Sequence, residues 1–284
     1  MGGVRAIGFL LCMIAGLSGR AQIYYTNLEV GVSGGGSQYF GDLNEHYGFR
    51  TVNYSAGICA RQRLNSYIAV KVVANFTRVG YDDKYNTAQY QVQRNLNFKS
   101  DIFEFAAQAE FNFFSYITGD KEHRYTPYLT GGIGVFNYDP YTTYNGKRTY
   151  LRPLGTEGQF AGYNARKYSS MSPCFPLGAG LKFWVRGGIN VIFEVADRLT
   201  TTDYLDDVSS TYVGINKFKQ NSAAAALQDR SKEIAPNVQL GTGKQRGNTA
   251  SYDQYLIANV TVTFNFTSYR CPRGVGTDDE MRRK

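Results

Sequence analysis

Side chains that could carry out chemistry are sparse in this 284-residue chain, which contains two histidines, His46 and His123. Nucleophilic catalysis needs a base such as histidine beside a serine or cysteine, together with a carboxylate that orients the base. Neither histidine stands in such a signature, and the strand pattern derived below predicts that they lie at opposite ends of the fold. We therefore expect no catalytic residue, no cofactor and no metal site, and interpret the protein as not an enzyme.

Three carboxylates, Asp203, Asp206 and Asp207, occur within five residues in the segment TTDYLDDVSSTY. Oxygen-rich clusters can bind Ca²⁺, but the spacing of an EF-hand loop is absent. We expect instead a loop that covers the end of a strand and pairs with Arg246 or Arg230.

Three consecutive glycines at 34–36 precede Ser37. A phosphate-binding loop would continue with Gly-Lys-Ser/Thr and open a helix, and neither follows. The glycines therefore predict a flexible transition from a strand to a loop.

The composition favours a large all-β protein. The chain has 23 Tyr, 18 Phe, 1 Trp and 31 Gly against 7 Pro, a mixture typical of many strands joined by turns. So many aromatic residues exclude disorder for the bulk of the chain. After the leader described next, no segment approaches 18 consecutive apolar residues, which excludes a helical membrane bundle.

The first 21 residues predict a secretory signal peptide. Arg5 precedes an apolar stretch at 6–17, and Gly19 and Ala21 supply the small residues of a cleavage site before Gln22. An exported chain should not meet nucleic acid, so its formal charge of +8 indicates no such partner. Three cysteines remain (Cys59, Cys174 and Cys271), and we expect them to be unpaired, with a Cys59–Cys271 bridge as the alternative.

Eight stretches alternate apolar with small or polar residues, as half-buried strands do: 27–33, 52–61, 68–77, 103–113, 129–135, 177–185, 190–198 and 256–266. The polar phase carries eight ionisable side chains, which a dry sandwich core could not hold without a large desolvation cost. If the apolar phase faces lipid instead, these charges fill a narrow lumen, pair with one another and, together with Trp184, plug it. They are Glu29, Arg61, Lys71, Glu104, Glu110, Lys182, Glu194 and Arg198.

The connections alternate in length. Short ones (62–66, 115–124 and 186–188) alternate with long ones (34–50, 81–99, 139–176 and 203–252), the latter including an expected helix at 222–234. This pattern predicts an eight-stranded antiparallel transmembrane β-barrel of the outer membrane, with long extracellular loops and both termini in the periplasm. The barrel should occupy 22–266, surrounded by outer-membrane lipid.

Residues 267–284 should form a periplasmic tail. The tail offers basic side chains for a partner, although a solvated tail without a partner is the simpler alternative. The candidate contact residues are Arg270, Arg273, Arg282, Arg283 and Lys284.

Four segments resemble the PorG-like outer-membrane barrels of the Bacteroidota: GGGSQYFGDLN (34–44), YTPYLTGGIGVF (125–136), RLTTTDYLDDVSSTY (198–212) and GKQRGN (243–248). QYFGDLN and TDYLDDVS are the specific parts. The resemblance implies a component of the type IX secretion system that associates with a periplasmic ring, built by a lipoprotein and its ring partner, and helps anchor the ring to the outer membrane. The family-like loop residues are Gln38, Tyr39, Phe40, Gly41, Asp42, Asp203, Tyr204, Asp206, Asp207 and Arg246.

Two other functions stay open at this point. A barrel could pass or bind small solutes, although a plugged lumen argues against a pore. A lipid-modifying barrel enzyme would depend on the two histidines, so replacing both tests that alternative.

Overall fold

The computed structural model describes residues 26–44, 47–234, 237 and 240–268. Its contacts divide the chain into a compact unit, Leu28–Asn265, and a second unit made of Met1–Asn27 and Phe266–Lys284. In the second unit only residues 26–27 and 266–268 are described, as ends of strands. Several predictions lie outside the described residues: the leader (1–21), His46, Cys271, and the tail residues Arg270, Arg273, Arg282, Arg283 and Lys284.

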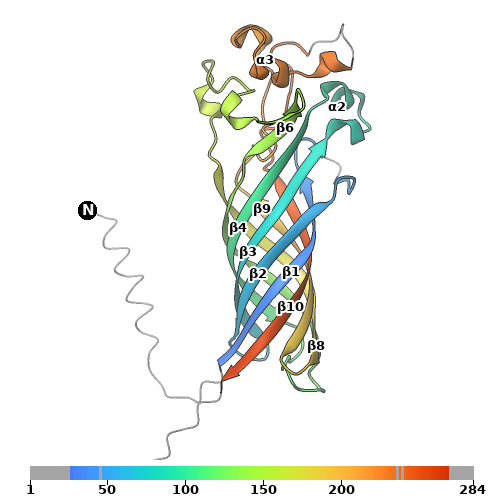
Figure 1. Cartoon of the computed structure of the whole chain (residues 1–284), viewed down its shortest axis with the longest axis vertical. Helices are drawn as coiled ribbons and strands as arrows, with labels where there is room; N and C mark the ends of the chain where they lie inside the picture. Colours follow the sequence, from blue (N-terminus) through green and yellow to red (C-terminus); the bar gives the residue numbers. More distant parts are fainter. Residues whose placement is uncertain (1–25, 45–46, 235–236, 238–239, 269–284) are drawn as a thin grey trace, which may run out of the picture. The chain divides into compact units, whose positions relative to one another are not determined.

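Over the described residues, eight strands form a closed antiparallel barrel, which confirms the predicted fold (Figure 1). Their order around the barrel is β3-β2-β1-β10-β9-β8-β5-β4, and pairing between β3 and β4 closes it. The strands are β1 (Thr26–Phe40), β2 (Asn53–Arg63), β3 (Ile68–Asp82), β4 (Asn97–Asn112), β5 (Tyr125–Asn137), β8 (Met171–Arg186), β9 (Ile189–Thr200) and β10 (Gln254–Ser268).

The outer surface of the barrel is apolar and its interior is polar, because successive side chains of a strand point to opposite faces. Ile58, Phe103 and Ile133 are 61%, 60% and 66% exposed on the outside. Arg61 and Glu104, on the opposite phase of β2 and β4, are buried. A continuous apolar exterior around a polar interior is the pattern of a barrel that faces lipid.

The long connections gather at one end of the barrel and the short turns (64–67, 113–124 and 187–188) at the other (Figure 1). The long ones carry a hairpin, β6 (Pro140–Tyr144) and β7 (Lys147–Tyr150), which extends the sheet because Tyr141 pairs with Lys99 of β4. No helix in the described part of the chain is long and apolar enough to cross a membrane. The helical pieces are α2 (Gln89–Arg94), α3 (Ala223–Gln228), η1 (Asp83–Tyr85), η2 (Arg152–Leu154), η3 (Asn164–Arg166), η4 (Ile215–Lys217) and η5 (Ser231–Glu233).

The strands are longer than the sequence predicts. The alternating stretches 52–61 and 103–113 have 10 and 11 residues, whereas β2 has 11 residues and β4 has 16. The glycines at 34–36 lie inside β1, so the predicted flexible transition to a loop is wrong. A Cβ atom on Gly35 would lie 2.0 Å from the carbonyl oxygen of Ala258, so the close approach of β10 requires glycine at this position.

Three smaller predictions are also corrected. The helix expected at 222–234 is two pieces: Ser222 caps α3 by accepting the Ala225 N–H, α3 ends at Gln228, and η5 follows as a separate turn. Trp184 does not plug the lumen, because its indole N–H donates to the Gly187 carbonyl in the short turn after β8. The last strand continues to Ser268, two residues past the predicted boundary of the barrel.

Candidate functional site: the lumen network and the loop cap

The structure brings the eight predicted lumen charges together inside the barrel, and we call them the lumen network. Glu110 is the centre of one group: its carboxylate lies 2.8 Å from Arg61 Nε, 3.2 Å from Lys71 Nζ and 2.6 Å from Lys182 Nζ. Arg61 also lies 3.0 Å from Glu29. This one buried carboxylate thus forms ion pairs with three cations, and their attraction offsets the cost of removing the charges from water.

Glu104 is the centre of a second group. It lies 3.0 Å from Arg198 Nε and accepts hydrogen bonds from the Tyr255 hydroxyl at 2.8 Å and the Asn75 amide at 2.9 Å. Glu194 pairs with Lys71 and accepts a hydrogen bond from the Tyr128 hydroxyl, which adds it to the Glu110 group. An eight-stranded barrel is wide enough only for side chains. This network, with four acidic and four basic members, therefore occupies the interior.

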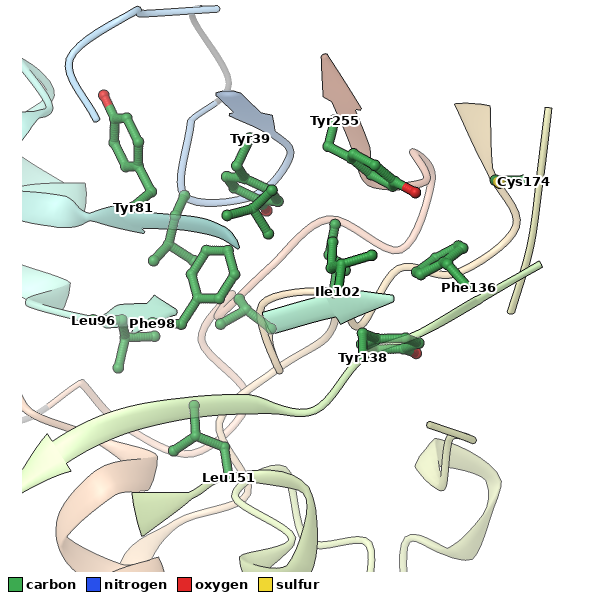
Figure 2. Close-up of a cluster of buried hydrophobic side chains, with 14 of the residues drawn as sticks. Tyr39, Tyr81, Leu96, Phe98, Ile102, Phe136, Tyr138, Leu151, Cys174 and Tyr255 are labelled. Atoms are coloured by element: carbon green, nitrogen blue, oxygen red, sulfur yellow. The ribbon is translucent and has the colours of Figure 1, made fainter. Parts of the chain in front are cut away.

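An apolar layer continues the interior toward the long loops. Figure 2 shows side chains from β1, β4, β5 and β10 turned toward one another there. Tyr39 meets Phe98 edge to face with ring centroids 4.8 Å apart, and Phe136 meets Tyr255 at 5.6 Å. Leu205 and Val208 from the long connection before β10 join the same cluster. The layer therefore ties the loops to the mouth of the barrel.

Above this layer the long loops bury a second polar cluster, which we call the loop cap: Asp42, Asp83, Arg94, Glu157, Asp203, Asp206, Asp207, Arg246 and Asp253. Glu157 lies 3.0 Å from Arg246 Nη1 and accepts the backbone N–H groups of Ser209 and Ser210. Arg246 also donates to the carbonyl of Asp207. One ion pair thus fixes three segments of the loops.

Arg94 at the end of α2 joins further loops. Its guanidinium binds Asp83 through Nε at 2.8 Å and Nη2 at 2.7 Å, the bidentate geometry that arginine favours. It also donates to the backbone carbonyls of Asp42 and Arg246. Asp42 in turn accepts the N–H of Asn248 at 2.9 Å. The loops after β1, β3 and β9 therefore converge on a single arginine.

Tyr39 links the apolar layer to the loop cap. Its hydroxyl lies 2.7 Å from an oxygen of Asp206 and 2.8 Å from an oxygen of Asp253. A phenol has one hydrogen to donate, so making both hydrogen bonds requires a proton on one of the two carboxyls. Burial, with repulsion from neighbouring carboxylates, raises the pKa of both Asp206 and Asp253 well above the usual range, which supplies that proton.

Two more carboxyls of the loop cap have raised pKa values. Burial raises the pKa of Asp203 to about 8, although the Ser209 side chain opposes that rise. Burial also raises the pKa of Asp207 to about 6, although Arg246 and hydrogen bonds from Thr156 and Tyr168 oppose that rise. The loop cap therefore holds carboxyls whose protonation changes between weakly acidic and neutral pH.

The family-like loop residues meet in this region. Gln38, Phe40 and Gly41 end β1 and begin its loop, and Tyr204 is stacked on Tyr168 with ring centroids 4.6 Å apart. Of the two arginines predicted to pair with the aspartate cluster, Arg246 does so, because its Nη2 lies 4.0 Å from a carboxylate oxygen of Asp207. Arg230 pairs with Glu233 instead. No cluster able to hold a metal ion occurs in the part of the chain that the structure describes.

Sequence reasoning missed Asp83, Arg94, Glu157 and Asp253, because isolated charges in long loops carry no periodic signal. Among the described cysteines, Cys59 and Cys174 are free thiols. The alternative Cys59–Cys271 bridge lies outside the described residues.

A closed antiparallel barrel with an apolar exterior, a polar interior and loops gathered at one end defines a transmembrane β-barrel of the outer-membrane type. The chain belongs to the family described as "Domain of unknown function (DUF6089)", whose model matches residues 4–221.

Several solved structures are similar to this chain. Neisserial surface protein A is 12% identical, with 84% of this chain and 97% of that chain covered and a TM-score of 0.42. The N-terminal β-barrel domain of Pseudomonas aeruginosa OprF is 10% identical, with 86% and 100% covered and a TM-score of 0.37. Ail, the attachment invasion locus protein of Yersinia pestis, is 9% identical, with 86% and 100% covered and a TM-score of 0.39. Comparison with curated proteins found no match.

Proposed function

We propose that this protein is a non-enzymatic outer-membrane component of the type IX protein secretion machinery. In this proposal the short turns and both termini face the periplasm, where the barrel binds the ring formed by a lipoprotein and its ring partner. The observation that carries the proposal is that the residues resembling PorG-like barrels converge on one buried cluster: Tyr39, Asp42, Asp206, Asp207 and Arg246 all belong to the loop cap or contact it.

The filled interior supports a role in contact rather than in transport. A solute pathway needs a water-lined lumen, and barrels with an aqueous channel have about 16–18 strands. Here the lumen network occupies the interior, and the apolar layer and the loop cap cover its mouth. The alternative of small-solute transport or ligand binding in the lumen is therefore the weaker one.

The environment of His123 supports a non-enzymatic role. His123 lies in the short turn at 113–124, with its Nδ1 2.7 Å from Asp120 and both side chains more than a third exposed. This pair belongs to one turn, which suits a local surface contact better than the nucleophile, base and orienting carboxylate of a lipid-modifying site.

Photo-cross-linking in intact envelopes tests the proposal. A photoreactive residue replaces Lys121 in a short turn, and the matched control replaces Asn145 at the tip of the β6–β7 hairpin. Mass spectrometry should identify the ring lipoprotein and its partner from position 121 and not from position 145. Capture of the ring proteins only from position 145, or from neither position in a fully assembled barrel, contradicts the proposal.

Truncation after Ser268 tests whether residues 269–284 contribute to this contact, and it leaves β10 complete. The expected result is a barrel with unchanged heat-modifiable migration that co-purifies with less of the ring. A truncated barrel that keeps every partner and full secretion removes the tail from the proposal, while the short-turn contact still stands on the cross-linking result.

A further inference from the structure

A pocket of about 490 Å³ lies on the outward side of the barrel wall near the long loops. Its lining comes from the start of β2, the end of β3, η1, the start of β4, β6 and the residue Arg230. It is separate from the lumen network and from the buried carboxylates of the loop cap, and it is lined by polar and apolar groups in similar measure.

The register of β3 and β4 places this pocket above the lipid-facing belt. Phe76 pairs with Phe103 at the end of the belt, and the next outward-facing pair is Arg78 with Asp101. Lys99, four residues beyond Phe103, lies about 13 Å further along the strand, or about 10 Å along the membrane normal at a tilt of about 40°. Headgroups extend about 5–8 Å from the hydrocarbon on each side. The pocket therefore opens at the level of the headgroups and the sugars above them.

The pocket combines cations with tyrosine rings. Lys99 is exposed and has no ion-pair partner in the described residues, while Lys84 lies 3.0 Å from Asp82 and 4.9 Å from the ring centroid of Tyr85. Arg230, which pairs with Glu233, and the Tyr141 ring complete the rim.

The wall beside the pocket is also basic. The single carboxylate of Asp101 is shared by Arg78 and Arg148, and the guanidinium of Arg148 stacks on the Tyr141 ring at 4.1 Å. The shared carboxylate leaves one excess positive charge there, which raises the local concentration of anions.

We propose that this pocket binds the phosphorylated sugar headgroup of an outer-leaflet glycolipid. Lys99 and Lys84 pair with the phosphate, since ammonium groups are compact phosphate partners. Tyr85, whose side chain is partly exposed, packs against the apolar face of a sugar ring, and the acyl chains lie along the apolar belt below. The inference rests on the outward orientation of the long loops in the proposed function.

Native mass spectrometry of the full chain in detergent tests the site with three probes: diphosphorylated lipid A, its deacylated disaccharide, and phosphatidylglycerol. Lipid A should bind best, the deacylated sugar more weakly at the same site, and phosphatidylglycerol weakest, because it lacks the sugar. The variant Lys84→Glu/Lys99→Glu should bind lipid A at least tenfold more weakly. The control Lys147→Glu/Lys244→Glu makes the same change in net charge at exposed lysines outside the pocket and should stay within twofold of the wild type.

Three outcomes overturn the inference: unchanged lipid A binding in the pocket variant, an equal loss in the control, or equal binding of lipid A and phosphatidylglycerol. Tyr85→Leu sharpens the test, since it should weaken the deacylated sugar severalfold and leave phosphatidylglycerol unchanged. Binding in detergent does not depend on orientation or on the periplasmic ring. Loss of ring cross-links with retained lipid A binding therefore contradicts the proposed function alone.

Discussion

The lumen network and the loop cap are both buried and polar, yet they balance charge in different ways. The lumen network has four carboxylates and four cations joined by ion pairs. Among the described residues of the loop cap, seven carboxyl groups accompany two arginines. The loop cap therefore relies on raised pKa values and on backbone N–H donors, as at Asp206 and Glu157.

Because of this difference, we expect the lumen network to form a rigid part of the barrel and the loop cap to respond to pH. The ion pairs of the lumen network join inward-facing side chains across the lumen, and the register of the strands fixes where these side chains lie. Hydrogen bonds between loops depend on which carboxyls hold a proton. Substitutions in the lumen network should thus affect the whole barrel, and substitutions in the loop cap should affect the loops.

The largest effect is expected from Glu110→Gln, which leaves Arg61, Lys71 and Lys182 without their shared carboxylate. Removing one partner of a buried ion pair costs about 3–5 kcal/mol, so the urea midpoint of the barrel refolded in lipid vesicles should fall clearly. Glu122→Gln, in an exposed short turn, is the control and should leave the midpoint unchanged. Equal midpoints for the two variants contradict the central place of Glu110.

Arg246→Met should act on the loop cap and spare the barrel. Glu157 and Asp207 lose their buried cation, a local cost of about 3 kcal/mol. Hydrogen exchange at Ser209 and Ser210, whose N–H groups bind Glu157, should then accelerate about 100-fold. Strand amides should keep their protection, as they should in the control Arg186→Met. General loss of protection across the strands contradicts a separable loop cap.

A glycine pair in β1 tests how tightly the barrel wall packs. Gly35→Ala places a methyl group against the Ala258 carbonyl and should cost about 1–3 kcal/mol of unfolding free energy. Gly34→Ala meets nothing within 4 Å and should be close to neutral, which makes it the matched control. Similar urea midpoints for the two variants contradict the close approach of β1 and β10.

The smallest effect concerns pH. The folded-state pKa of Asp203, about 8, lies above the unfolded value of about 3.9. Folded chains therefore bind more protons across that window, and protection of the loop cap should be greatest at its acidic end and decline as the pH rises toward 8. Asp203→Asn should flatten this decline in hydrogen exchange corrected for the intrinsic rate. An unchanged slope in the variant assigns the effect to other carboxyls, such as Asp207.

The sequence predicts the barrel and its interior because both follow from a period of two. Once the apolar phase is assigned to lipid, the positions of Arg61, Glu110 and Lys182 follow without knowledge of the loops. The limits of β1 do not follow in the same way, because the glycines at 34–36 have no side chains to show alternation although their backbone still pairs.

The loop cap could be predicted only in part. The pairing of Arg246 with the aspartate cluster was one of two options, and Glu157 gave no signal because its partners lie about 50–90 residues away in the chain. The β6–β7 hairpin, by contrast, carries a local signal in the sequence. Asn145 and Gly146 both have positive φ in its turn, the conformation that an Asn-Gly pair favours between strands.

Solute flux through the purified full chain in liposomes distinguishes a filled barrel that acts by contact from a barrel that passes solutes. We expect no flux of small ions or sugars above the level of protein-free vesicles, between pH 6 and 8. Steady flux through the wild-type barrel, altered by Glu110→Gln and not by Glu122→Gln, would overturn the contact role and favour a transport function.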